Sequence, residues 1–141
     1  MNVSRVLVDA NVLLDVLTDD PRWFEWSASQ IEKLEGEYEL CINPLIYAEV
    51  SVRYDTIEAL EAALPESEFN RVELPWAAGF LAGKAYLDYR RRRGVRRSPL
   101  ADFYIGAHAA ISGMALLTRD AARYRTYFPT VEIIAPDGGG E

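Results

Sequence analysis

The sequence VLVDANVLLDVL occupies residues 6–17 and decides the fold. Three consecutive apolar residues, Val6 to Val8, are typical of a short buried strand, which is expected over residues 4–8. After Asp9 the apolar residues return at helical spacing, so a helix is expected over residues 11–17. A strand that leads directly into a helix is the start of a β-α-β unit. The chain is therefore predicted to open an α/β fold with an aspartate at the junction.

The same alternation of short apolar runs and helical segments continues along the chain. Further strands are predicted over residues 38–42, 71–74, 115–117 and 131–135. Asp20, Asn43 and Ser98 each precede a proline, an order typical of a helix cap followed by the first helical residue. The predicted helices begin at these three caps and at Thr56, Trp76 and Asp120. Short strands separated by helices indicate a mainly parallel sheet covered on both faces.

The length of 141 residues and the 50% hydrophobic content suit one folded domain. We expect this domain to span residues 1–135, with residues 136–141 (PDGGGE) as a flexible tail. The single cysteine, Cys41, lies in an apolar run and is expected to be buried rather than disulfide-bonded. Charged residues interrupt every apolar stretch near the N-terminus, so neither a signal peptide nor a membrane span is expected. A cytoplasmic location is predicted.

The formal net charge of −7 argues against a general nucleic-acid-binding protein. However, six of the 15 basic residues lie in the stretch RRRRGVRR at residues 90–97. These arginines can belong to a solvated helix end, where positive charge favours the helix dipole. They can also bind phosphates or a partner locally, and six arginines exceed what capping requires. Both interpretations remain open at this point.

Four acidic residues lie where an apolar run meets the start of a helix: Asp9, Glu49, Asp102 and Asp120. In an open parallel sheet, ligands bind beyond the carboxyl ends of the strands, where such junctions meet. Four carboxylates at that edge would repel one another unless they held a positive group. Oxygen ligands suit Mg²⁺ or Mn²⁺. The pattern predicts a metal-dependent enzyme that acts on phosphate esters.

Each acid also has a structural interpretation. Asp102 near a helix start stabilises the helix dipole by about 0.3–1 kcal/mol, and either Arg97 or a metal can neutralise it. Glu49 is the only residue charged at neutral pH between Pro44 and Val52, which favours a functional role. Asn11 and Thr118 each lie two residues from one of the aspartates and are predicted to orient a carboxylate or a metal-bound water.

Two other features are candidates for function. His108 follows Asp102 by six residues and therefore points about 120° away from it on a helix, so we interpret His108 as a packing residue near Tyr104. Phe24 and Trp26 cannot both share the buried helix face predicted for Trp23. Exposed aromatics would suit a partner protein, whereas additional core packing is the alternative.

The chain resembles the PIN-domain ribonucleases, and most closely the VapC-type toxins of bacterial and archaeal toxin–antitoxin pairs. The resemblance rests on VLVDANVLLDVL at 6–17, INPLIYAEV at 42–50, SPLADFYIGAHAA at 98–110 and LLTRDAARYRTYFP at 116–129. It implies a three-layer α/β/α sandwich with a central, mainly parallel sheet. It also implies that the four acids form a site for Mg²⁺ or Mn²⁺, supported by Asn11 and Thr118. The chain has Ala121 and Ala122 where many relatives have another polar residue, which leaves a fifth site residue without a candidate.

The resemblance further implies an endoribonuclease toxin that hydrolyses RNA with a metal-activated water, a cognate VapB-type antitoxin and a homodimer. Arg93, Arg96 and Arg97 are predicted to contact the RNA. A non-catalytic binding protein with the same fold is the alternative. A haloacid-dehalogenase-like phosphatase is disfavoured, because Asn11 occupies the position where that chemistry needs a second acid.

Overall fold

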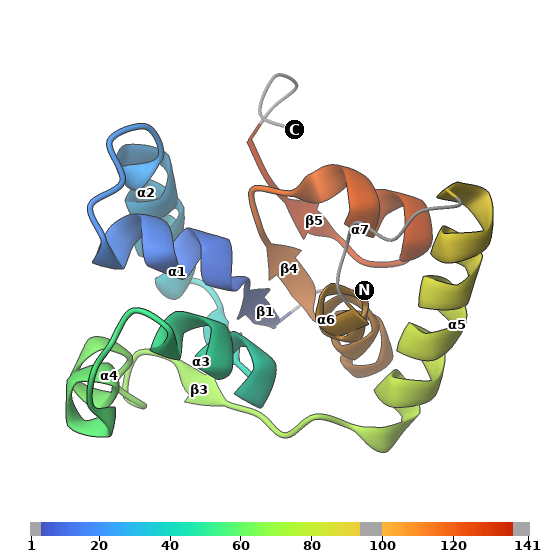
Figure 1. Cartoon of the computed structure of the whole chain (residues 1–141). Coiled ribbons are helices and arrows are strands. Elements are labelled where there is room, and N and C mark those ends of the chain that lie inside the picture. Colours follow the sequence, from blue (N-terminus) through green and yellow to red (C-terminus); the bar gives the residue numbers. More distant parts are fainter. Residues whose placement is uncertain (1–3, 94–99, 137–141) are drawn as a thin grey trace.

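The computed structural model describes residues 4–93 and 100–136, which fold around a five-stranded sheet (Figure 1). The strand order is β3-β2-β1-β4-β5, and the four pairings between neighbouring strands are parallel. The strands are β1 (Arg5–Val8), β2 (Glu39–Ile42), β3 (Asn70–Arg71), β4 (Ala115–Leu117) and β5 (Ile133–Ile134). The prediction of an α/β fold with a mainly parallel sheet is confirmed.

Seven helices of the described chain connect and cover these strands. They are α1 (Ala10–Leu17), α2 (Phe24–Glu35), α3 (Pro44–Ser51), α4 (Ile57–Ala63), α5 (Trp76–Arg93), α6 (Leu100–Ser112) and α7 (Ala121–Tyr127). Helix α5 packs along α6 and lies on the outside of the molecule in Figure 1. None of the described helices is long and apolar enough to cross a membrane.

The sheet has a switch point between β1 and β4. From β1 the chain adds β2 and β3 on one side, then returns to place β4 and β5 on the other side. Val8 at the end of β1 is in register with Leu117 at the end of β4, and the Asp9 N–H donates to the Leu117 carbonyl at 2.9 Å. A switch point is where open α/β sheets bind their ligands. It brings the junctions after β1 and β4 together although they are far apart in sequence.

The core is built on the apolar runs that the sequence indicated. Val6, Leu7 and Val8 are fully buried, and so is Cys41, as predicted. Asn43 caps α3, because its side-chain oxygen accepts from the Ile46 N–H at 2.9 Å.

Gly106 of α6 marks a close approach between elements. A Cβ atom at this position would lie 2.5 Å from the ring of Phe128, so only glycine lets that buried ring pack against the helix.

Several predicted boundaries shift. Asp20 accepts from the N–H groups of Arg22 and Trp23, both at 2.9 Å, so it caps a turn, and α2 begins only at Phe24. Both edge strands, β3 and β5, are two residues long, shorter than the predicted 71–74 and 131–135. The predicted cap at Ser98, Arg96 and Arg97, and residues 137–141 of the predicted tail lie outside the described residues. The same holds for the Arg93 side chain.

The aromatic residues at the start of α2 are not exposed. Trp23, Phe24 and Trp26 are all partly buried, and the two tryptophan rings meet edge to face with centroids 6.2 Å apart. Trp26 packs against the core. Additional core packing is therefore confirmed for Trp26, whereas contact of Phe24 and Trp26 with a partner protein stays a prediction.

Candidate active site

The four predicted acids line one cleft of about 390 Å³ at the switch point of the sheet. Asp9 leaves β1, Glu49 lies on α3, Asp102 lies in the first turn of α6, and Asp120 precedes α7. The lining of this acidic cleft consists of these four residues together with Ala10, Asn11, Leu14, Val52, Arg53, Arg123 and Tyr124. Four separate elements therefore deliver carboxylates to one place.

Asp9 is the most buried of the four acids, with 5% of its surface exposed. One carboxylate oxygen accepts from the Ala10 N–H at 2.8 Å. The other accepts from the hydroxyl groups of Thr118 at 2.9 Å and Tyr124 at 3.2 Å. Burial raises the pKa of Asp9 to about 6, although these hydrogen bonds lower it in part. The carboxylate is thus held firmly, but no described residue pairs a positive charge with it.

Thr118 and Asn11 form the polar support around Asp9. The Thr118 hydroxyl donates to Asp9 and accepts from the Asn11 side-chain amide at 3.2 Å and from the Asp120 N–H at 3.1 Å. The Asn11 oxygen in turn accepts from the Arg119 N–H at 3.2 Å. One hydroxyl group therefore links the Asp9 side chain to the backbone of Asp120.

Glu49 enters the cleft without a hydrogen bond or ion pair to any described residue. Burial raises its pKa, and together with the charges of Asp9 and Asp102 brings it to about 7. The carboxyl group of Glu49 therefore changes its protonation near neutral pH when no cation is present.

Asp102 and Asp120 share the guanidinium group of Arg123. Its Nη1 lies 3.2 Å from an Asp102 oxygen and 2.9 Å from an Asp120 oxygen. Burial raises the pKa of Asp102, Arg123 lowers it, and Asp120 raises it again. The partner of Asp102 in the described chain is therefore Arg123, and the predicted partner Arg97 lies outside the described residues. The sequence offered only the three-residue spacing between Asp120 and Arg123 as a signal for this contact.

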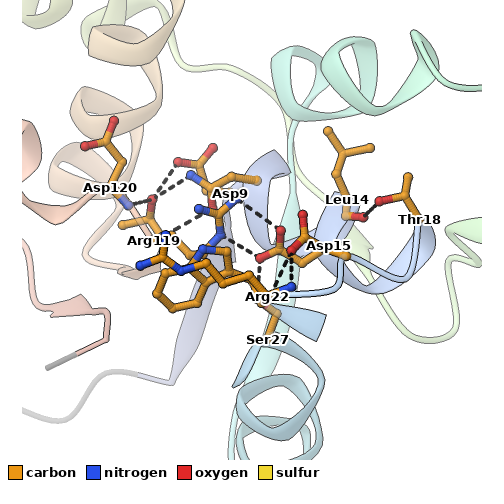
Figure 2. Close-up of polar contacts among 12 residues, drawn as sticks. Asp9, Leu14, Asp15, Thr18, Arg22, Ser27, Arg119 and Asp120 are labelled. Carbon is orange, nitrogen blue, oxygen red and sulfur yellow. Dashed lines mark hydrogen bonds and ion pairs between the residues drawn. The ribbon is translucent and has the colours of Figure 1, made fainter. Parts of the chain in front are cut away.

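A second arginine anchors the segment between β4 and α7. Arg119 donates to the buried carboxylate of Asp15, through Nε at 2.6 Å and Nη2 at 3.0 Å. The Ser27 hydroxyl also donates to Asp15 at 2.6 Å, and Arg119 stacks over the ring of Trp23 at 5.1 Å. Figure 2 shows this contact beside Asp9 and Asp120. The segment that carries Thr118 and Asp120 is thus fixed to α1 and α2.

His108 does not line the cleft. It is buried, and its Nδ1 lies 3.0 Å from the side-chain nitrogen of Asn43, so it ties α6 to the start of α3. Burial lowers the pKa of His108. The interpretation of His108 as a packing residue agrees with this position, and its hydrogen-bond partner is Asn43.

The acidic cleft has the chemistry of a site for a hard divalent cation. By formal charge, the four carboxylates and the two guanidinium groups of the lining, those of Arg53 and Arg123, leave two negative charges in excess when all four acids are ionised. Oxygen donors with excess negative charge suit Mg²⁺ or Mn²⁺. As the side chains stand, no group of three or more acidic, histidine or cysteine residues within 4–93 and 100–136 converges closely enough to hold a metal.

Comparisons with known proteins agree with the fold. The sequence profile of the PIN domain family matches residues 6–129. No curated protein matches the chain.

Several solved structures have the same fold. A chain of VapBC2 from Rickettsia felis, bound to a DNA fragment from their promoter, is 15% identical, with a TM-score of 0.69 over 93% of this chain and 98% of that chain. A chain of FitAcB from Neisseria gonorrhoeae is 18% identical, with a TM-score of 0.70 over 93% and 97%. A chain of a toxin–antitoxin complex from Klebsiella pneumoniae is 19% identical, with a TM-score of 0.56 over 84% and 89%. The family profile covers nearly all of the described fold, from β1 through α7, and this chain belongs to the PIN domain family.

Proposed function

We propose that this protein is a metal-dependent endoribonuclease and the toxin of a toxin–antitoxin pair. The observation that carries the proposal is the acidic cleft, where four carboxylates from four elements outnumber the two arginines of the lining. Membership of the PIN domain family supports a nuclease. The cleft lies at the switch point of the sheet, which is the usual ligand site of such folds.

A bound Mg²⁺ or Mn²⁺ would supply an activated water and would neutralise charge on the phosphodiester. Asp9, Asp102 and Asp120 would hold the metal. Thr118 and Tyr124 keep the Asp9 carboxylate oriented through their hydroxyl groups. The Glu49 carboxylate has no other partner and can hold a second ion or take a proton from the attacking water. The products implied by the family resemblance are a 5′-phosphate and a 3′-hydroxyl.

The proposed substrate is single-stranded RNA, whose bases can be splayed and recognised. Arg53 and Arg123 of the cleft lining are suited to contact its phosphates. Arg93, Arg96 and Arg97 remain predicted RNA contacts. They follow the exposed residues Arg90 to Arg92 at the end of α5.

Cleavage of labelled total RNA tests the proposal. Discrete fragments are expected with Mg²⁺ or Mn²⁺, and none with EDTA or with Asp102→Ala. Glu32→Ala is the matched control, because Glu32 is an exposed acid on α2 that does not line the cleft. Mapped 5′-phosphate ends would identify the target RNA. Cleavage that persists in EDTA, or in Asp102→Ala, would contradict the proposed chemistry.

The alternative is a PIN-fold protein that binds RNA or protein without turnover. It is favoured by the observation that no three carboxylates of the described residues lie close enough together to hold a metal. Calorimetry with Mn²⁺ separates the two candidates. Absent metal binding together with absent cleavage would support the binding protein.

The proposed partner is a VapB-type antitoxin. Val52 at the rim of the cleft is 82% exposed, and Ile57 at the start of α4 is 63% exposed. An antitoxin segment that covers these apolar side chains would also close the cleft. Co-purification with the product of an adjacent gene tests this partner. Val52→Asp and Ile57→Asp should weaken the complex without unfolding the toxin.

We also propose a homodimer that forms through α5. Trp76, Phe80 and Leu87 are exposed, and at roughly 100° per residue they lie within about 40° of one another around the helix. Gly83 lies in the middle of this stripe, and a Cβ atom there would meet nothing within 4 Å. A second copy that packs antiparallel would place Phe80 against Leu87 of the partner subunit, with Gly83 near the two-fold axis.

Light scattering tests the dimer. The wild-type protein should have the mass of two chains, and Phe80→Glu should have the mass of one. Ile57→Glu is the control, because it changes an exposed apolar residue away from α5. A monomeric wild-type protein at micromolar concentration would exclude this interface.

A further inference from the structure

Arg123 is a cation of the acidic cleft that is paired with two of its carboxylates. A single nitrogen, Nη1, bridges Asp102 of α6 and Asp120 at the start of α7. Its two oxygen partners belong to residues that we propose as metal ligands. A guanidinium group and a divalent ion cannot occupy the same position between two carboxylates.

The arginine is incompletely satisfied where it lies. A guanidinium group has five N–H donors, and both ion pairs of Arg123 use Nη1. Its Nε is buried without a hydrogen-bond partner among the described residues. A buried donor without an acceptor costs free energy, so this position is less favourable than two short ion pairs suggest.

Arg119, in the same region, has more contacts than Arg123. Arg119 binds Asp15 through two nitrogens and also stacks on Trp23. Arg123 has no such paired contact: its guanidinium carbon lies 6.0 Å from the Tyr124 ring, and its side chain is 20% exposed toward the cleft. Arg123 is therefore the arginine that can leave its carboxylates and remain in the cleft.

We propose that Arg123 competes with the divalent metal for Asp102 and Asp120, and binds a phosphate of the RNA once the metal has displaced it. The inference rests on the proposed function. Arginine suits the second role because its planar fork binds two phosphate oxygens at once. The exchange keeps Asp102 and Asp120 neutralised in both states. It also turns a group that blocks the metal into one that holds the substrate.

The proposal predicts opposite effects of one substitution on two ligands. By calorimetry, Arg123→Gln should bind Mn²⁺ about tenfold more tightly, the factor that corresponds to about 1.4 kcal/mol for one charged hydrogen-bonded contact. With Mn²⁺ present, and in a Glu49→Gln background that should not cleave but keeps Asp9, Asp102 and Asp120, the same change should weaken binding of a short single-stranded RNA by a similar factor. For Arg123→Lys, both the Mn²⁺ affinity and the RNA affinity should lie between those of the proteins with Arg123 and with Arg123→Gln.

Arg125→Gln is the matched control, because Arg125 lies on the same helix but does not line the cleft. It should change Mn²⁺ affinity by less than the Arg123 substitution. Circular dichroism establishes that each variant is folded. A merely structural role for Arg123 would lower both affinities together.

The outcomes separate this inference from the proposed function. Tighter Mn²⁺ binding with weaker RNA binding supports the exchange, even if no RNA is cleaved and the nuclease assignment fails. Unchanged or weaker Mn²⁺ binding in Arg123→Gln overturns it, even if the wild-type protein is an active nuclease. Tighter Mn²⁺ binding with unchanged RNA affinity also overturns it, because Arg123 would then not bind a phosphate of the RNA after the metal displaces it.

Discussion

The guanidinium group of Arg119 reaches across from the end of β4 and donates two hydrogen bonds to Asp15, a carboxylate of α1 that is only 3% exposed. This pair joins two segments 104 residues apart in sequence. Because Arg119 lies between Thr118 and Asp120, the pair also fixes both residues relative to Asp9.

Asp15→Asn should destabilise the fold. The substitution leaves Arg119 without its buried counter-ion, and we expect a loss of about 2–3 kcal/mol, below the usual cost of breaking a buried pair because Arg119 is partly exposed. Urea unfolding measures this loss. Asp19→Asn, at an exposed neighbouring acid, is the control and should change stability by less than about 0.5 kcal/mol. Equal stability of both variants would mean that the pair contributes little.

Asp9→Asn should remove a pH dependence of stability. The Asp9 pKa rises from 3.8 to about 6 on folding, so the folded state holds this proton more tightly than the unfolded chain. The resulting stabilisation is complete below about pH 4 and is lost as pH rises through 6, a change of about 3 kcal/mol.

In the absence of metal, the stability of Asp9→Asn relative to the wild-type protein should therefore increase between pH 4 and pH 7.5. Unfolding in urea at several pH values measures it. Asp88 lies on the exposed face of α5. The free energy of unfolding of Asp88→Asn should therefore change with pH in the same way as that of the wild-type protein. The hypothesis fails if the two aspartate variants have the same pH profile.

Gly106→Ala should destabilise the protein by about 1–3 kcal/mol, because the new methyl group would overlap the buried ring of Phe128. Thermal unfolding measures the effect. Adding Phe128→Leu to this variant should recover part of the loss, since the smaller side chain makes room. A double variant less stable than the sum of both single changes would contradict the overlap.

Mn²⁺ should raise the melting temperature of the wild-type protein. A ligand at 100 times its dissociation constant stabilises by about 2.7 kcal/mol. Asp102→Ala should lose most of this gain, because Asp102 is a proposed metal ligand, whereas Glu32→Ala should keep it. An equal gain in the wild-type protein and Asp102→Ala would place the metal elsewhere.

The sequence was sufficient to predict the elements that carry the acids. The apolar run before Asp9 and the cap at Asn43 are local signals, and the structure has a strand and a helix there. Parallel strands bring their carboxyl ends to one edge, so the meeting of Asp9 and Asp120 could also be anticipated.

The ion pairs could not be anticipated in the same way. Which arginine reaches Asp102 or Asp15 depends on the order of the strands, and in particular on β4 lying beside β1. Periodicity contains no information on that order. For this reason Arg97 was considered for Asp102, whereas Arg123 and Arg119 became visible only in three dimensions.

The hydrogen bond from Thr118 to Asp9 spans 109 residues, and it has a consequence for the order of events during synthesis. The ribosome synthesises the chain from the N-terminus. Asp9 therefore emerges long before Thr118 and Tyr124, the side chains that bind it. Contacts between distant segments form late, after the cost of closing a long loop has been met. A chain cut short before residue 118 lacks Thr118, Asp120, Arg123 and Tyr124 together. Incomplete translation products would therefore lack one complete side of the acidic cleft, and with it the support of Asp9.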